Sequence, residues 1–260
     1  MTDALSLPRE LVEDAAGAFA RYRFAYDHDL LIQQSWHSER DGRHLACALG
    51  VLGGEVTGPK KCPAQVMPAW LAKMVPGFFD RLAFDDAKAW GLALYEQLAR
   101  LGGQVPFSVI YDWQATCVLE FWAGSLKKRR FDAPQLADKL AQVEALQALH
   151  RRHMAGGAAP KAEWLEALRP VYRHADAYAD AYAYADAYAD ADAYADADAY
   201  ADADAYADAD ADAYADAVPT ASAPADETPA AKRARRRAEN LKLLADGLVA
   251  AIARVPGPAA

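Results

Sequence analysis

Hydrophobic side chains recur every three or four positions along most of residues 1–174, the spacing that places them on one face of an α-helix. Capping and turn residues divide this pattern into successive helices. The expected helices begin near Ser6 and Pro8, after Asp41-Gly42, after Cys62-Pro63, at Asp85, at Pro106, at Asp132 and at Pro160. Only residues 105–111 also suit a strand. The sequence therefore predicts an all-α, compact multi-helix domain over residues 1–174.

Two of these predicted helices have distinct end signals. The helix after Asp41-Gly42 carries Leu45, Leu49 and Leu52 on one side and should stop at Gly53-Gly54. The helix that follows Cys62-Pro63 should close at Pro76-Gly77, because proline and glycine interrupt helical hydrogen bonding.

The C-terminal region, residues 218–260, changes character twice. Residues 218–231 are rich in Pro, Ala, Ser and Thr, which is typical of a flexible linker. Residues 232–260 begin with a basic stretch and continue with Leu241, Leu244 and Leu248, so they predict a short basic amphipathic helix. A heptad spacing would allow a coiled coil with another helix, but only about two heptads are present. Docking on the main domain is therefore favoured.

Residues 175–217 form a low-complexity Ala-Asp/Tyr repeat. Every odd position is Ala, and the even positions hold 13 Asp and 8 Tyr. Alanine favours a long frayed helix, which would be a solvated spacer because it has no apolar face. The uncompensated charge favours disorder. The period of two also permits a stack of β-strands through the Ala face. All three structures remain open.

The net charge of the chain is −9, but it is unevenly distributed. The repeat carries −13, whereas residues 1–174 carry +1 and residues 218–260 carry +3. The acidity is therefore not a property of the predicted domain. No signal-peptide pattern and no run of about 18 apolar residues occur, so we expect neither secretion nor a membrane partner. Three cysteines at irregular spacing favour reduced thiols and a cytoplasmic location.

Reactive side chains are densest at His37, His44, Cys47 and Cys62. On a helix, His44 and Cys47 would share a face, and the other two could approach from flanking loops. These residue types are compatible with a tetrahedral zinc site. Their spacing matches no known closed zinc motif, and a buried cysteine is more often a packing residue than a ligand. No cofactor is expected otherwise.

The same residues suggest a catalytic alternative. Cys47 could act as a nucleophile with His44 as its base, oriented by Glu39 or Asp41. No loop suited to an oxyanion hole is evident. A small zinc-dependent or thiol enzyme centred on His44 and Cys47 is therefore the alternative to a binding protein.

Basic side chains cluster at the start of the C-terminal helix, and these are candidate binding residues: Lys232, Arg233, Arg235, Arg236 and Arg237. Another basic cluster lies at residues 127–130. Such clusters can contact phosphates, which makes nucleic-acid binding a second alternative. The 13 Asp of the repeat would compete for them, so solvated helix ends or contacts within the chain are the simpler interpretation.

Two sequence motifs resemble one group of proteins. Trp36-His37-Ser38 with residues 42–47, followed by Cys62-Pro63-Ala64 and Met67-Pro68-Ala69-Trp70-Leu71-Ala72, is similar to helical proteins of bacteriophages and prophages that have no established activity. Those proteins carry an Ala-rich segment before a short Leu-rich C-terminal helix, similar to residues 237–255. The resemblance follows most of the chain in order, with its specific part in residues 36–72.

The resemblance implies a phage or prophage accessory protein in the cytoplasm of a bacterial host, with no inherited catalytic residues. Combined with the uneven charge, it favours a non-enzymatic protein that binds a protein partner of unknown identity.

Overall fold

The computed structural model describes residues 6–168 and 228–257. The Ala-Asp/Tyr repeat and most of the predicted linker lie outside the described residues. The chain divides into two compact units, Met1–Pro106 with Val249–Ala260 (unit 1) and Phe107–Leu248 (unit 2). The sequence predicts one domain over residues 1–174, whereas the structure divides this stretch after Pro106 and assigns the C-terminal helix to both units.

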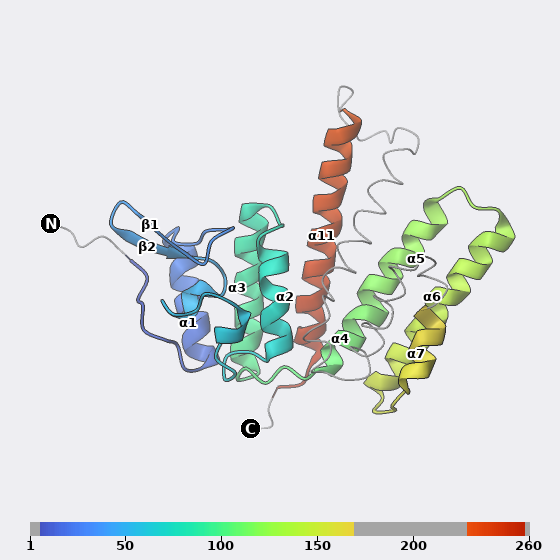
Figure 1. The fold of residues 1–260 in the computed structure, drawn as a ribbon, viewed down its shortest axis with the longest axis horizontal. Helices are drawn as coiled ribbons and strands as arrows, with labels where there is room; N and C mark the ends of the chain where they lie inside the picture. The colour runs from blue at the N-terminus through green and yellow to red at the C-terminus, as the bar shows by residue number, and fades with distance from the viewer. Residues whose placement is uncertain (1–5, 169–227, 258–260) are drawn as a thin grey trace. The chain divides into compact units, whose positions relative to one another are not determined.

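Helices dominate both units, as Figure 1 shows. Unit 1 contains α1 (Ala15–Asp27), β1 (His37–Arg40), β2 (Arg43–Ala46), the 3-10 turns η1 (Gly50–Leu52) and η2 (Pro59–Lys61), α2 (Ala69–Phe79) and α3 (Phe84–Arg100). Unit 2 contains α4 (Ser108–Trp113), the π-helical turn η3 (Gln114–Val118), α5 (Leu119–Lys128), α6 (Ala133–Met154) and α7 (Lys161–Leu168). The helix α11 (Pro229–Arg254) begins in unit 2 and ends in unit 1.

The predicted all-α class is confirmed, with one two-stranded hairpin as the only sheet in the described residues. The helices expected at Asp85, Pro106, Asp132 and Pro160 are present, and the strand alternative over residues 105–111 gives way to α4. The C-terminal helix begins at Pro229, three residues before its predicted start. None of the described helices combines the length and apolarity needed to cross a membrane.

The start predicted for the first helix is wrong. The helix begins at Ala15, where the Asp14 side chain accepts a hydrogen bond from the Gly17 amide at 2.7 Å. The preceding residues are not helical and run beside a later loop instead. The Val12 amide donates to the Leu52 carbonyl at 2.7 Å, and the Gly54 amide donates to the Arg9 carbonyl at 2.8 Å.

The helix predicted after Asp41-Gly42 is also wrong, because these two residues form the turn of a β-hairpin. Both have positive φ, 53° at Asp41 and 71° at Gly42, as a two-residue type I′ turn requires. The strands β1 and β2 pair antiparallel from Arg40 opposite Arg43 to His37 opposite Ala46. The hydrophobic spacing of Leu45, Leu49 and Leu52 therefore reflects a strand followed by a buried turn, not a helix.

The predicted stop at Pro76-Gly77 is wrong as well. Helix α2 continues through Pro76 to Phe79, and both Phe78 and Phe79 are buried. Burial of these two aromatic side chains offsets the loss of one backbone hydrogen bond at the proline.

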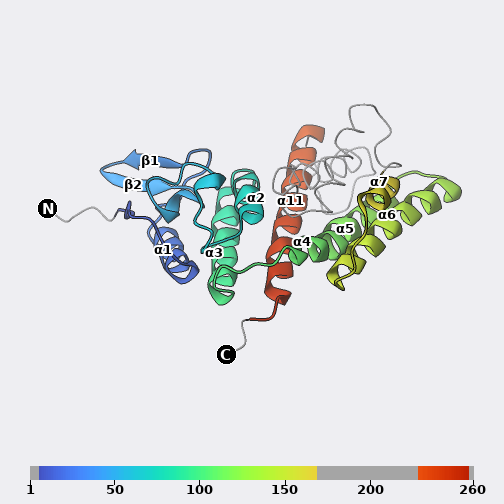
Figure 2. The ribbon, with the colours of Figure 1, turned by 60° about the horizontal axis from the view of Figure 1, so that its bottom comes forward.

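Two buried tyrosines join the helices of unit 1. Figure 2 shows α1 and α3 side by side. The rings of Tyr22 on α1 and Tyr95 on α3 stack with their centroids 4.7 Å apart, and the Tyr95 hydroxyl donates to the Ala48 carbonyl at 2.6 Å. A Cβ atom on Gly91 of α3 would lie 2.0 Å from the Tyr22 hydroxyl oxygen. The missing side chain at Gly91 thus allows the two helices to approach.

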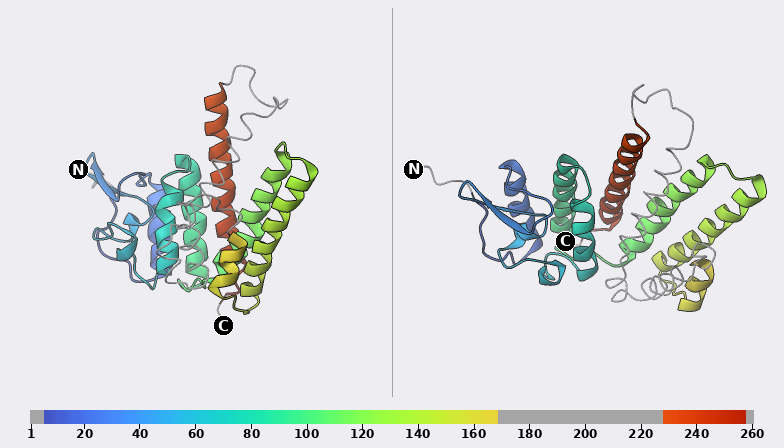
Figure 3. Two further views of the ribbon diagram at one scale, coloured as in Figure 1. Left: turned by 45° about the vertical axis from the view of Figure 1, so that its right-hand side comes forward. Right: turned by 45° about the horizontal axis from the view of Figure 1, so that its top comes forward.

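Unit 2 depends on contacts around its π-helical turn. Helices α5 and α6 lie side by side in Figure 3, and the Gln147 side chain of α6 donates to the Ala115 carbonyl in η3 at 3.0 Å. Trp113, at the end of α4, donates from Nε1 to the Leu244 carbonyl of α11 at 2.9 Å. A Cβ atom on Gly247 would lie 2.2 Å from Cys117 Sγ, so a glycine is required where α11 crosses η3.

We expect Gly91→Ala to destabilise the protein by about 1–3 kcal/mol, because the new methyl group overlaps the Tyr22 ring. The matched control is Gly124→Ala in α5, where an added Cβ meets nothing within 4 Å. That exchange should stabilise by about 0.5–1 kcal/mol through helix propensity alone. Urea unfolding measures both, and equal effects of the two substitutions would contradict the close approach at Gly91.

A buried histidine should make unit 2 sensitive to acid. Burial, together with the charge of the nearby His153, lowers the pKa of His150 to about 3. Between pH 6.5 and pH 3 the unfolded chain therefore binds more protons at this residue, so the free energy of unfolding falls as the pH falls.

For one proton, this slope is at most about 1.4 kcal/mol per pH unit. We expect His150→Gln to flatten the loss of stability between pH 6.5 and pH 4.5, measured by urea unfolding. His28→Gln in unit 1 serves as the control and should retain the wild-type slope. A His150→Gln slope equal to that of the wild type would contradict this prediction.

Candidate functional site

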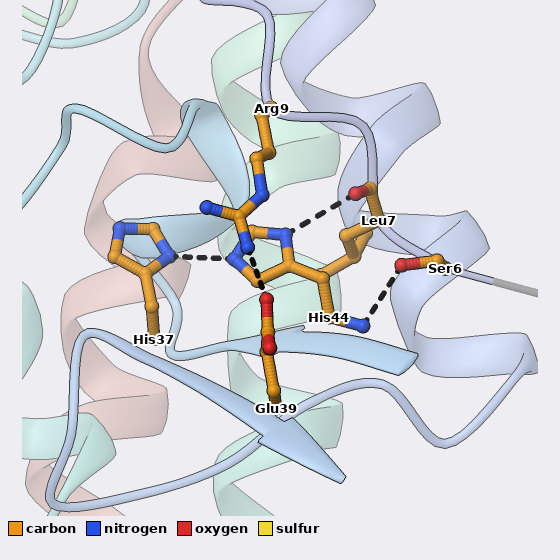
Figure 4. A network of polar contacts seen from close by, with 6 residues as sticks. All are labelled: Ser6, Leu7, Arg9, His37, Glu39 and His44. Carbon is orange, nitrogen blue, oxygen red and sulfur yellow. Dashed lines mark hydrogen bonds and ion pairs between the residues drawn. The ribbon is translucent and has the colours of Figure 1, made fainter. Parts of the chain in front are cut away.

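The β-hairpin places two of the predicted ligands on one face. Glu39 lies opposite His44 across the hairpin, and His37 precedes Glu39 by two residues on the same strand. Because alternate residues of a strand share a face, His37, Glu39 and His44 project to the same side. Figure 4 shows the two imidazole rings facing each other, with a ring nitrogen of each directed at the other.

Both imidazoles are held in place by backbone carbonyls. His44 Nδ1 lies 3.2 Å from the Leu7 carbonyl oxygen, and His37 Nε2 lies 3.1 Å from the Val56 carbonyl oxygen. A carbonyl oxygen only accepts, so each of these ring nitrogens carries a proton and donates it. The remaining ring nitrogens, His44 Nε2 and His37 Nδ1, face each other at 3.1 Å.

The surroundings of the pair are partly buried and carry charges of both signs. His44 is 5% exposed and His37 is half-buried. Arg9 forms an exposed ion pair with Glu39 at 2.5 Å beside the rings (Figure 4). Burial lowers the pKa of His37, and the charges of His44 and Arg9 lower it further, whereas the Val56 carbonyl and Glu55 act in the opposite direction.

The two predicted cysteine ligands are not brought to the histidines. Cys47 follows β2, so the expected helix face shared with His44 does not exist. The Cys47 sulfur accepts a hydrogen bond from the Gly50 amide at 3.4 Å, and the Cys62 thiol contacts the Pro63 carbonyl at 3.9 Å. Within the described ranges, no group of three or more His, Cys, Asp or Glu side chains is arranged to hold a metal ion. The four predicted ligands are thus reduced to one histidine pair.

Burial also determines the chemistry of the two thiols. It raises the pKa of Cys47 to about 11 and the pKa of Cys62 to about 12. Both therefore remain protonated at neutral pH, whereas a nucleophilic cysteine needs a lowered pKa. Their environment is that of packing residues.

The second candidate site is the basic segment of α11, defined as residues 232–237. Arg233 and Arg235 are exposed, while Lys232, Arg236 and Arg237 are half-buried. The acidic side chain that follows the segment is Glu239, which pairs with Arg235 at 2.8 Å and with Arg236 at 3.3 Å. Residues 232–239 still carry a formal charge of +4.

The apolar face of α11 begins after this segment and is used within the protein. No described side chain from residue 230 to residue 239 is buried. Beyond residue 239, the buried side chains of the helix lie on one face, and they are Asn240, Leu241, Leu244, Ala245, Leu248, Ala251 and Ile252. In unit 1, Arg100 donates to the Val255 and Ile252 carbonyls at 2.7 and 2.9 Å. Of the two predicted alternatives, docking within the protein is therefore the one observed.

The sequence-based prediction missed the groups that anchor the histidines, because they are backbone carbonyls of residues distant in sequence. A signal for the hairpin was present, since the pair Asp41-Gly42 is typical of a type I′ turn.

Comparison with known proteins adds no assignment: no protein-family model, no curated protein and no solved structure matches the chain.

We expect Cys47 and Cys62 to react slowly with iodoacetamide in the native protein. Relative to a thiol of pKa 9.0, the raised pKa of Cys47 lowers its thiolate fraction about a hundredfold at pH 8, and that of Cys62 falls further. Mass spectrometry of the alkylated protein measures the rates, with the same protein in urea as the reference. Native rates equal to the rates in urea would contradict the buried environment of these thiols.

Proposed function

We propose that this chain is a non-enzymatic binding protein that engages an acidic surface of a protein partner through the basic segment of α11. The observation that carries the proposal is the division of this helix into two halves. The second half buries its apolar face within the protein, and the first half, which buries no described side chain, presents five cationic residues in six positions.

Local charge favours this interpretation despite the acidic composition of the chain. At physiological ionic strength, charges more than about 8 Å apart are strongly screened. The formal +4 of residues 232–239 is therefore a local charge that the net −9 of the whole chain does not describe. Arginine predominates among these cations, and its planar guanidinium group pairs with carboxylates through two parallel hydrogen bonds.

The raised pKa values of Cys47 and Cys62 favour binding over thiol catalysis. A nucleic-acid partner is the second candidate, favoured by the same arginines. A duplex, however, extends its phosphates over a long distance and would also meet the charge of the 13 Asp in the repeat. A protein surface of limited size avoids that repulsion.

The resemblance of residues 36–72 to phage and prophage proteins supports the biological setting. We accordingly place this binding role in an accessory protein of a bacteriophage or prophage, acting in the cytoplasm of the bacterial host.

The test reverses two charges in the basic segment and leaves the buried half of α11 unchanged. Deletion of residues 218–260 would remove Leu244 and Leu248 from the core, so a loss of binding would be ambiguous. Arg233→Glu with Arg235→Glu alters only exposed side chains. The matched control is Lys127→Glu with Lys128→Glu, which reverses two exposed charges at the end of α5.

We expect the wild type and the Lys127/Lys128 control to capture the same protein partner from nuclease-treated host lysate, and the Arg233/Arg235 variant to bind that purified partner at least about tenfold more weakly. The estimate follows from the loss of two exposed ion pairs and their replacement by repulsion. Capture that disappears on nuclease treatment would support nucleic acid instead. Equal affinity of the wild type and both variants would contradict the role of the basic segment.

A further inference from the structure

The hydrogen bonds of the histidine pair in the hairpin determine which ring nitrogens carry a proton. His44 Nδ1 and His37 Nε2 each donate their proton to a carbonyl oxygen. A neutral imidazole carries only one N–H, so the two inner nitrogens, His44 Nε2 and His37 Nδ1, both present lone pairs. Two lone pairs facing each other at 3.1 Å repel unless a cation lies between them.

We propose that His37 Nδ1 and His44 Nε2 form a binding site for one divalent transition-metal ion of the zinc type, with water completing its coordination. This site is separate from the basic segment of α11 and does not depend on the proposed binding role.

The distances are compatible with this ligand. Tetrahedral zinc with bonds of about 2.0–2.1 Å to nitrogen places two nitrogen ligands about 3.3–3.4 Å apart. The observed separation is 3.1 Å, so a small rotation of the half-buried His37 ring would admit the ion. The exposed side of His37 also gives the ion access from solvent.

The outer nitrogen of each ring has the kind of hydrogen-bond acceptor that usually orients a metal-binding histidine. Histidine ligands usually donate their second ring nitrogen to a backbone carbonyl or a carboxylate, which fixes the ring and its tautomer. The Leu7 and Val56 carbonyls occupy these positions here. They come from two different segments outside the hairpin, so the outer nitrogen of each ring has its acceptor before any ion binds.

Charged side chains of both signs lie near the pair. Glu55 favours a positive charge at His37, whereas Arg9 opposes it. Glu39 shares the face and holds Arg9 in an ion pair, which offsets part of the positive charge of Arg9.

The test is a calorimetric titration of zinc chloride into the full chain at pH 7.5 with its thiols kept reduced. We expect one zinc-binding site that His37→Gln weakens by at least about tenfold, since loss of even an outer partner of a ligand costs 10–100-fold. His44→Gln should have the same effect. His28→Gln is the matched control in the same unit and should leave the titration unchanged.

The His37 variant is the decisive one, because His37 is half-buried whereas the buried His44 also contributes to packing. Nitrogen-15 spectra of the wild-type imidazoles add a direct measurement, in which zinc should shift His37 Nδ1 and His44 Nε2. Identical titrations of wild type and His37→Gln would overturn the proposal, as would an absence of zinc binding by the wild type. A proton shared between the two rings that zinc does not displace would overturn it as well.

Discussion

The turn at Asp41 and Gly42 is the constraint on which the histidine site depends. Positive φ at both residues sets a two-residue loop, and this loop fixes the register of β1 against β2. A shift of one residue would move His44 to the opposite face from His37, because side chains alternate along a strand. Backbone conformation at two residues thus places the two imidazoles on the same face of the hairpin.

Unit 1 also holds the pair from outside the hairpin. The segment before α1 supplies the Leu7 carbonyl and the loop around Val56 supplies the other acceptor. The segment before α1 also pairs with the turn after β2, through Val12 with Leu52 and Arg9 with Gly54. Stacked Tyr22 and Tyr95 connect the same turn to α1 and α3, since the Tyr95 hydroxyl donates to Ala48. The rings are consequently positioned by the core of unit 1 and not by the hairpin alone.

Helix α11 illustrates how burial divides one element into two roles. Its side chains Leu241, Leu244 and Leu248 lie in the protein interior, where Gly247 permits contact with Cys117 and Trp113 donates to the Leu244 carbonyl. Its first turns keep their cationic side chains on the exposed and half-buried surface. A helix whose apolar face is already occupied offers a partner mainly its charge, and the proposed binding role rests on this difference between the two halves.

The sequence by itself determined the helical class, the approximate starts of α3, α6 and α7 and the apolar stripe of α11, because helix periodicity is a local property. The cap at Asp132 is also as predicted, whereas α3 begins at Phe84 without a side-chain cap from Asp85. It also identified His37 and His44 as reactive residues. It misplaced the first helix and predicted a helix start at Asp41-Gly42. Leu45, Leu49 and Leu52 are buried by a strand and the turn that follows it, but their spacing also fits one face of a helix. Only the tertiary structure decided that Cys47 and Cys62 do not join the histidines in one cluster and that two distant carbonyls orient the rings. Backbone carbonyls are present at every residue, so their use as partners is set by the fold and leaves no trace in the sequence.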